Sequence, residues 1–147
     1  MQFAHRPEGR RERRSAADVV LFAEAWLSLG LAATQLKLRP FEQVMRFKAP
    51  RTSGSGGGAE IARLVWAVGA ARRRSWLRAK CIESALALRA MLRRRNVAAT
   101  LHYGVRNAGG EQLQAHVWLS VDGTVVMGGE EAAGFTEVAS FGAPVSA

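Results

Sequence analysis

The sequence is poor in the residues that bind metals and form disulfides, with one cysteine and three histidines among 147 residues. A single cysteine cannot form an internal disulfide, and scattered histidines do not give the ligand spacing of a zinc site. The glycine-rich stretch 54–58 is not followed by Lys-Ser or Lys-Thr, so it is not a phosphate-binding loop. We therefore expect neither a metal nor another cofactor.

The N-terminus also lacks the continuous apolar stretch of a signal peptide, so we expect a cytoplasmic protein. Residues 1–14 contain Pro7, Gly9 and several arginines with almost nothing to bury, and they are predicted to form a basic, flexible arm. The most hydrophobic segment, Val19 to Leu36, is interrupted by polar residues such as Glu24 and is barely long enough to cross a bilayer. It is predicted to be a buried or interfacial helix.

Acidic residues are fewer than basic ones, 12 against 21, which gives a formal net charge of +9. Such a chain attracts anions, and its arginine runs at 72–74 and 93–95 could contact nucleic acid. No aromatic residues of the kind that stack on bases are interleaved with these runs. We therefore interpret the runs as solvated helix faces and expect no nucleic-acid partner.

The first two thirds of the chain have the three- and four-residue apolar spacing of amphipathic helices. Ser15 is a candidate N-cap, and Pro40 ends the first helix and could open a short second one. The segment Pro50 to Gly58 is predicted to be a flexible loop. The predicted long helices run from Asp18 to about Leu38, from about Ala59 to Arg73, and from near Lys80 to Arg95.

After Asn96 the apolar period changes from 3.6 to 2, which predicts strands. Asp122-Gly123 is a strong two-residue hairpin signal. Helices followed by antiparallel strands predict a single α+β domain over residues 15–147, with the helices packed on a small sheet. The predicted strands are Val97 to Arg106, Leu113 to Val121 and Thr124 to Met127, with a turn at Asn107 to Glu111.

Cys81 lies at the start of the predicted fourth helix, where unpaired backbone N–H groups and the helix dipole favour a thiolate. Arg78 and Lys80 add positive charge beside it. The same N–H groups could hold the oxyanion of a tetrahedral intermediate. The competing interpretation is structural, because free cysteines are often small buried hydrophobic residues.

His116 supports the catalytic interpretation of Cys81. A cysteine at a helix start followed by a histidine on a strand is the layout of papain-like and transglutaminase-like sites. In those sites the imidazole takes the thiol proton and later protonates the leaving amine. His102, on the preceding predicted strand, is the alternative base.

A third group should orient the imidazole. A two-residue turn at Asp122-Gly123 pairs 121 with 124 and, by extension, 116 with 129. This register brings Glu130 near His116, with Glu131 next, and a direct bond would need a bulge or the end of pairing at the adjacent glycines. Asp122 is the weaker candidate because it lies at the tip of the hairpin.

Several stretches of the chain resemble the lasso peptide B2 proteins, which are cysteine leader peptidases with a transglutaminase-like fold. The resemblance covers about residues 18 to 141. It is carried by the run from Cys81 to Arg95, by Leu101 to Arg106, by His116 to Leu119 with the Asp-Gly hairpin, and by Val125 to Glu130.

The resemblance implies a Cys-His-acid peptidase in which Cys81 and His116 carry over directly. Many relatives have Asp shortly after the third strand, whereas this chain has Gly128-Gly129-Glu130. The implied partners are a precursor peptide, a separate leader-recognition protein and an ATP-dependent lasso cyclase. Residues 1–14 are too few for the recognition domain that some relatives carry.

Two other functions stay open from the sequence. The chain could be a non-catalytic peptide- or nucleic-acid-binding module with Cys81 merely buried. It could also be a transglutaminase-like amidase or acyltransferase that uses the same residues.

Overall fold

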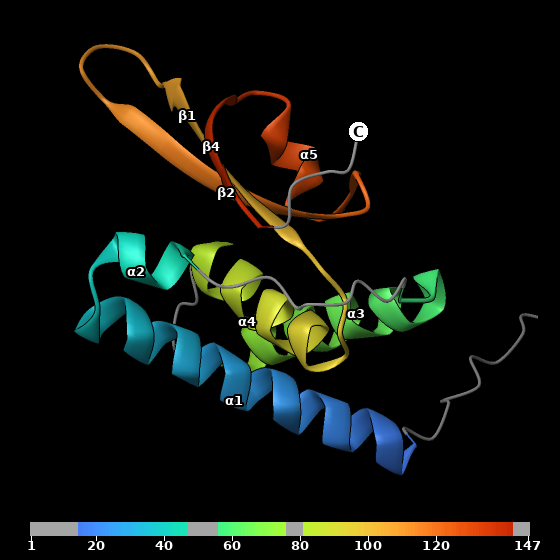
Figure 1. Cartoon of the computed structure of the whole chain (residues 1–147). Coiled ribbons are helices and arrows are strands. Elements are labelled where there is room, and N and C mark those ends of the chain that lie inside the picture. The colour runs from blue at the N-terminus through green and yellow to red at the C-terminus, as the bar shows by residue number, and fades with distance from the viewer. Residues whose placement is uncertain (1–14, 47–55, 76–80, 143–147) are drawn as a thin grey trace, which may run out of the picture.

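Five helices and four strands follow one another in the computed structural model, which describes residues 15–46, 56–75 and 81–142 (Figure 1). The predicted arm at 1–14 and most of the predicted loop at 50–58 lie outside these residues. The helices are α1 (Ala16–Leu38), α2 (Phe41–Met45), α3 (Gly58–Arg74), α4 (Cys81–Arg94) and α5 (Gly129–Ala132). The strands are β1 (Thr100–Asn107), β2 (Leu113–Val121), β3 (Thr124–Met127) and β4 (Thr136–Phe141).

The first helix begins and ends as its sequence predicts. The Ser15 hydroxyl accepts from the Asp18 backbone N–H and the Asp18 carboxylate accepts from the Ser15 N–H, which together form a capping box. Arg39 has extended backbone after the last turn, and Pro40 caps the short helix α2. α1 is long and apolar enough to cross a membrane by length and composition alone. One face of α1 is buried at Leu21, Ala25, Ser28, Leu29 and Ala32.

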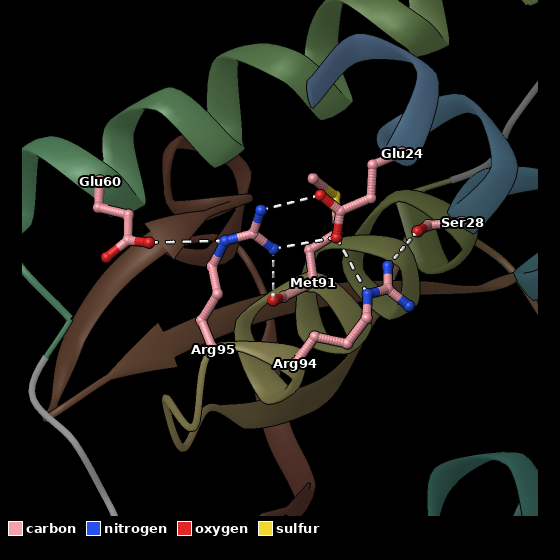
Figure 2. Close-up of polar contacts among 6 residues, drawn as sticks. All are labelled: Glu24, Ser28, Glu60, Met91, Arg94 and Arg95. Atoms are coloured by element: carbon pink, nitrogen blue, oxygen red, sulfur yellow. Dashed lines mark hydrogen bonds and ion pairs between the residues drawn. The ribbon is translucent and has the colours of Figure 1, made fainter. Parts of the chain in front are cut away.

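A polar cluster joins α1 to the C-terminal end of α4, as Figure 2 shows. Arg95 donates to both carboxylate oxygens of Glu24, at 3.0 and 2.8 Å, and Arg94 Nε donates to Glu24 Oε1 at 3.0 Å. These arginines hold the pKa of Glu24 below its ordinary value of 4.5. Arg93 and Arg94 are exposed, as expected for a solvated face, whereas Arg95 is half-buried against the Glu24 carboxylate of another helix.

The sheet is antiparallel with the strand order β3-β2-β1-β4. The first predicted strand begins three residues later than expected, at Thr100. Two elements at the C-terminal side, α5 and β4, were not predicted, because α5 is a single turn after two glycines and β4 is mostly exposed. Neither therefore has the apolar periodicity that identifies an element in a sequence.

The two faces of β2 have different neighbours. Val117, Leu119 and Val121 join the apolar core that α1, α3 and α4 form on one side of the sheet (Figure 1). His116, Trp118 and Ser120 alternate with them and are also buried, on the face away from that core. Both faces of this strand are therefore covered from His116 onward.

The hairpin register begins as expected and then shifts. Val121 pairs with Thr124, but the register shifts between Leu119 and Ser120, so that Leu119 pairs with Met127. The inferred pairing of His116 with Gly129 is therefore wrong, because an extra residue on β3 moves the ladder by one position and β3 ends at Met127.

Candidate active site

Cys81 is the first residue of α4 and is half-buried. The helix behind it is anchored in the core by residues such as Leu88 and Met91, which are fully buried. Its first turn therefore has a fixed position, and the backbone N–H groups of that turn face the start of the helix, where Cys81 lies. Such groups can stabilise an oxyanion that forms beside them.

His116 lies on β2 opposite Gly104, and only 4% of its surface is exposed. Its Nε2 is 2.9 Å from the backbone carbonyl oxygen of Gly128. Because a carbonyl can only accept, the proton of the neutral imidazole lies on Nε2 and the lone pair on Nδ1. Nδ1 is therefore the ring atom that can act as a base.

The backbone of Gly128 determines where this carbonyl lies. Gly128 has φ of 78° and ψ of 10°, a left-handed conformation that residues with a Cβ rarely adopt. A Cβ at this position would be 2.9 Å from the Val117 carbonyl oxygen and 3.1 Å from Trp118 Cβ. Glycine thus allows the chain that leaves β3 to press against β2 and to aim its carbonyl at His116.

Cys81 and His116 line two cavities together, one of about 450 Å³ and one of about 500 Å³. No hydrogen bond joins Cys81 Sγ to the imidazole among the described residues. Catalytic contacts are often long in the absence of substrate, so the shared cavities are the relevant observation. The smaller cavity is also lined by Val65, Arg72, Ser84, Val117, Val125, Val126, Met127, Gly128, Gly129, Glu130 and Glu131. The larger one is also lined by Arg106, Gln114, Ala115, Glu130, Glu131, Gly134 and Phe135.

Comparison with known protein families matches residues 25–140 to the model of the transglutaminase-like superfamily. The chain belongs to the transglutaminase-like superfamily. The match spans both Cys81 and His116, and catalysis in this superfamily usually depends on a cysteine. No curated protein and no solved structure matches the chain. The predicted fold, helices with a small antiparallel sheet in a transglutaminase-like domain, is confirmed.

The candidate acidic residues of this transglutaminase-like domain lie at different distances from the imidazole of His116. Glu131 Oε2 is 3.5 Å from His116 Nδ1, whereas Glu130 lines both cavities without a hydrogen bond or ion pair to His116. Asp122 lies in the hairpin turn with φ of 49° and lines neither cavity. The role predicted for Glu130 stays a prediction, and Gly128 and Glu131 are the groups that contact the ring.

His102 lines neither of the cavities that Cys81 lines. Its Nε2 is 2.7 Å from Ser120 Oγ and its Nδ1 is 3.1 Å from Glu137 Oε1. Because it lies outside these cavities, His102 is poorly placed to take a proton from Cys81. The geometry therefore favours His116 over His102 as the base.

Two neighbours of the imidazole, Trp118 and Phe135, were not identified from the sequence. Their rings contact the ring of His116, with centroids 6.1 and 5.2 Å away. Trp118 could have been found, because residues two apart on a strand share a face. Phe135 could not, since only tertiary folding brings it to His116. The hairpin register did place Gly128 near His116, but it did not identify the Gly128 carbonyl as the acceptor.

Within residues 15–46, 56–75 and 81–142, no three or more His, Cys, Asp or Glu side chains lie close enough together to hold a metal ion.

Proposed function

We propose that this chain is a cysteine peptidase that removes the leader from a ribosomally synthesised precursor peptide during lasso peptide maturation. The observation that carries the proposal is the pairing of Cys81, at the start of α4, with His116 in two shared cavities. The hydrogen bond from His116 Nε2 to the Gly128 carbonyl supports it, because that bond places the lone pair of the neutral imidazole on Nδ1, where it can accept a proton.

The proposed reaction begins when His116 Nδ1 takes the proton of the Cys81 thiol. The thiolate attacks the scissile carbonyl carbon, and the oxyanion is held by N–H groups of the first turn of α4. The imidazolium then protonates the leaving amine, and the C–N bond breaks to leave a thioester on Cys81. A water molecule, deprotonated by His116, hydrolyses the thioester and restores the thiol.

The two cavities support an extended peptide as the substrate. The smaller cavity combines apolar side chains, including Val65, Val125 and Met127, with the charged side chains of Arg72, Glu130 and Glu131. The larger cavity has the polar side chains of Arg106 and Gln114. A chain lying across Cys81 would place the residues on either side of the scissile bond in different chemical surroundings.

The assignment to lasso peptide maturation is supported by the sequence resemblance around Cys81 and His116. It carries three further proposals: a cytoplasmic location, a separate leader-recognition protein that presents the precursor, and an ATP-dependent cyclase that takes the core peptide. Binding the leader beside the site would raise the effective substrate concentration without changing the chemistry.

Replacement of Cys81 and His116 tests the peptidase. Cys81→Ala and Cys81→Ser are expected to abolish precursor cleavage, measured by mass spectrometry, while circular dichroism shows an unchanged fold. His116→Ala should be nearly as damaging, because residues that act as one catalytic unit do not lose activity additively. Cleavage by a folded Cys81→Ala variant would rule out the proposed nucleophile.

The superfamily match favours one second candidate, an amidase or acyltransferase, because the same thioester can pass to an amine instead of water. Adding hydroxylamine to the cleavage assay separates an acyltransferase, which yields mainly the hydroxamate, from the proposed peptidase, which yields mainly the free carboxylate. An amidase would yield a carboxylate without cutting the precursor backbone. A non-catalytic module would give neither product.

A further inference from the structure

The base His116 is one member of a row of rings in contact on the face of the sheet away from the helical core. Its imidazole contacts Phe135, with planes 37° apart, and Trp118, with planes 21° apart. The indole of Trp118 lies in turn on His102, with centroids 5.5 Å apart and planes only 8° from parallel. The order along the row is therefore Phe135, His116, Trp118 and His102.

His102, at the end of this row, is held on both ring nitrogens. Ser120, which is buried, contacts Nε2 at 2.7 Å, and Glu137 on β4 contacts Nδ1 at 3.1 Å. Because a carboxylate only accepts, Nδ1 donates to Glu137 and Nε2 accepts from the Ser120 hydroxyl. Residues on three strands, β1, β2 and β4, thus fix this ring.

The indole of Trp118 has little freedom between these neighbours. A Cβ added to Gly104, on β1 beneath it, would be 2.7 Å from Trp118 Cζ3 and 2.8 Å from Cη2. Trp118 itself is 7% exposed. A displacement of the indole must therefore be accommodated by the rings on either side of it, His102 and His116.

We propose that His102 is a positioning residue: clamped by Ser120 and Glu137, it holds Trp118, and through Trp118 it holds the imidazole of His116 in the orientation that directs Nδ1 to the cavities of Cys81. The proposal rests on the proposed catalytic roles of Cys81 and His116. His102 itself touches neither the thiol nor either shared cavity.

The size of the effect follows from how accurately a base must be oriented. Active groups have to stay within roughly 0.5 Å and 10–20° of the productive geometry, and their supporting residues maintain it. The Gly128 carbonyl fixes Nε2 but leaves rotation about that bond, which the flanking rings restrict. Removing one ring of the row should lower turnover without changing how the peptide is bound.

Two substitutions separate the ring of His102 from its acid-base chemistry. His102→Ala removes the ring and is expected to lower kcat on the precursor by about tenfold with KM within about twofold. His102→Phe keeps a ring against Trp118 and should stay within about threefold of the wild-type kcat. Glu137→Ala keeps the ring and the contact with Ser120 but removes the other side of the clamp, so its loss of kcat should not exceed that of His102→Phe.

Tyr103→Ala is the matched control, because Tyr103 precedes Gly104 on β1 but packs against the helical core, edge-on to Phe41. It should lower the melting temperature while leaving kcat of the folded protein unchanged. Equal losses of kcat in Tyr103→Ala and His102→Ala would show a merely structural effect and overturn the proposal. A dead His102→Phe variant would also overturn it, because that result would make His102 the base.

Alkylation of Cys81 by iodoacetamide gives a readout that needs no precursor. His102→Ala should slow alkylation by about fivefold at pH 7, where His116 assists ionisation, and leave it unchanged at about pH 10, where an ordinary thiol is ionised.

Nitrogen NMR gives a second readout. It should show the Nε2–H tautomer of His116 in the wild type and a mixture of the two tautomers in His102→Ala. Wild-type behaviour in both measurements would refute the role of His102, whereas cleavage by Cys81→Ala would refute only the proposed peptidase.

Discussion

Adding a single methyl group to Gly128 should break the hydrogen bond between its carbonyl oxygen and His116 Nε2. Gly128→Ala places a Cβ in a left-handed backbone and 2.9 Å from the Val117 carbonyl oxygen. The backbone conformation costs about 1–2 kcal/mol and the overlap about 1–3 kcal/mol, so the free energy of unfolding should fall by roughly 2–5 kcal/mol. The Gly128 carbonyl must also move away from His116 Nε2.

The effect on catalysis follows from the change in charge of His116 during the reaction. A hydrogen bond between neutral groups contributes about 1 kcal/mol and one to a charged group about 1.5–3 kcal/mol. The difference is realised only when the imidazolium forms, so losing the bond should raise the barrier by about 1–1.5 kcal/mol. That corresponds to about a tenfold loss of kcat.

Gly129→Ala is the matched control for this substitution. It adds the same methyl group one residue later, where the Cβ would meet the side chain of Val125 at 3.0 Å and no positive φ is required. We expect kcat within about threefold of wild type and a smaller stability change. The assays are kcat on the precursor and chemical denaturation of both variants. Wild-type kcat in folded Gly128→Ala would refute the role of this carbonyl.

The remaining predictions concern acidic side chains. From the sequence, Glu130→Gln should lower kcat by about tenfold. The Glu131 carboxylate lies 3.5 Å from His116 Nδ1 and would stabilise the imidazolium once Nδ1 is protonated, so we expect the larger loss for Glu131→Gln. Asp122→Asn should change the melting temperature more than kcat, and the reverse result would place the acid in the turn. Glu24→Gln should lower the free energy of unfolding by about 1 kcal/mol at pH 7, since its bonds to Arg95 and Arg94 are partly exposed. Because the pKa of Glu24 is lowered in the fold, that stability should disappear as the pH falls below about 4.5, so wild type and variant should converge in acid denaturation curves.

Local sequence patterns determined much of the fold and part of the candidate site. The Ser15 capping box, the turn at Asp122-Gly123 and the helix beginning at Cys81 depend on residues close together in the chain, so a pattern read from the sequence predicts them. Cys81 and His116 were identified for the same reason: a helix start and a strand position can each be recognised locally, and the two side chains carry distinctive chemistry.

Only the tertiary structure decided how the base is held. The register shift at Leu119 and Ser120 comes from packing between strands and has no signature in the hairpin sequence. Every residue has a carbonyl, so nothing local distinguishes the carbonyl of Gly128 as the acceptor for His116. The clamp on His102 depends on Glu137, which lies on β4. This strand is mostly exposed, so its sequence lacks the alternating apolar pattern that would have identified it. Such contacts join residues far apart in the chain, and their geometry is set by the packing of the whole domain rather than by local propensity.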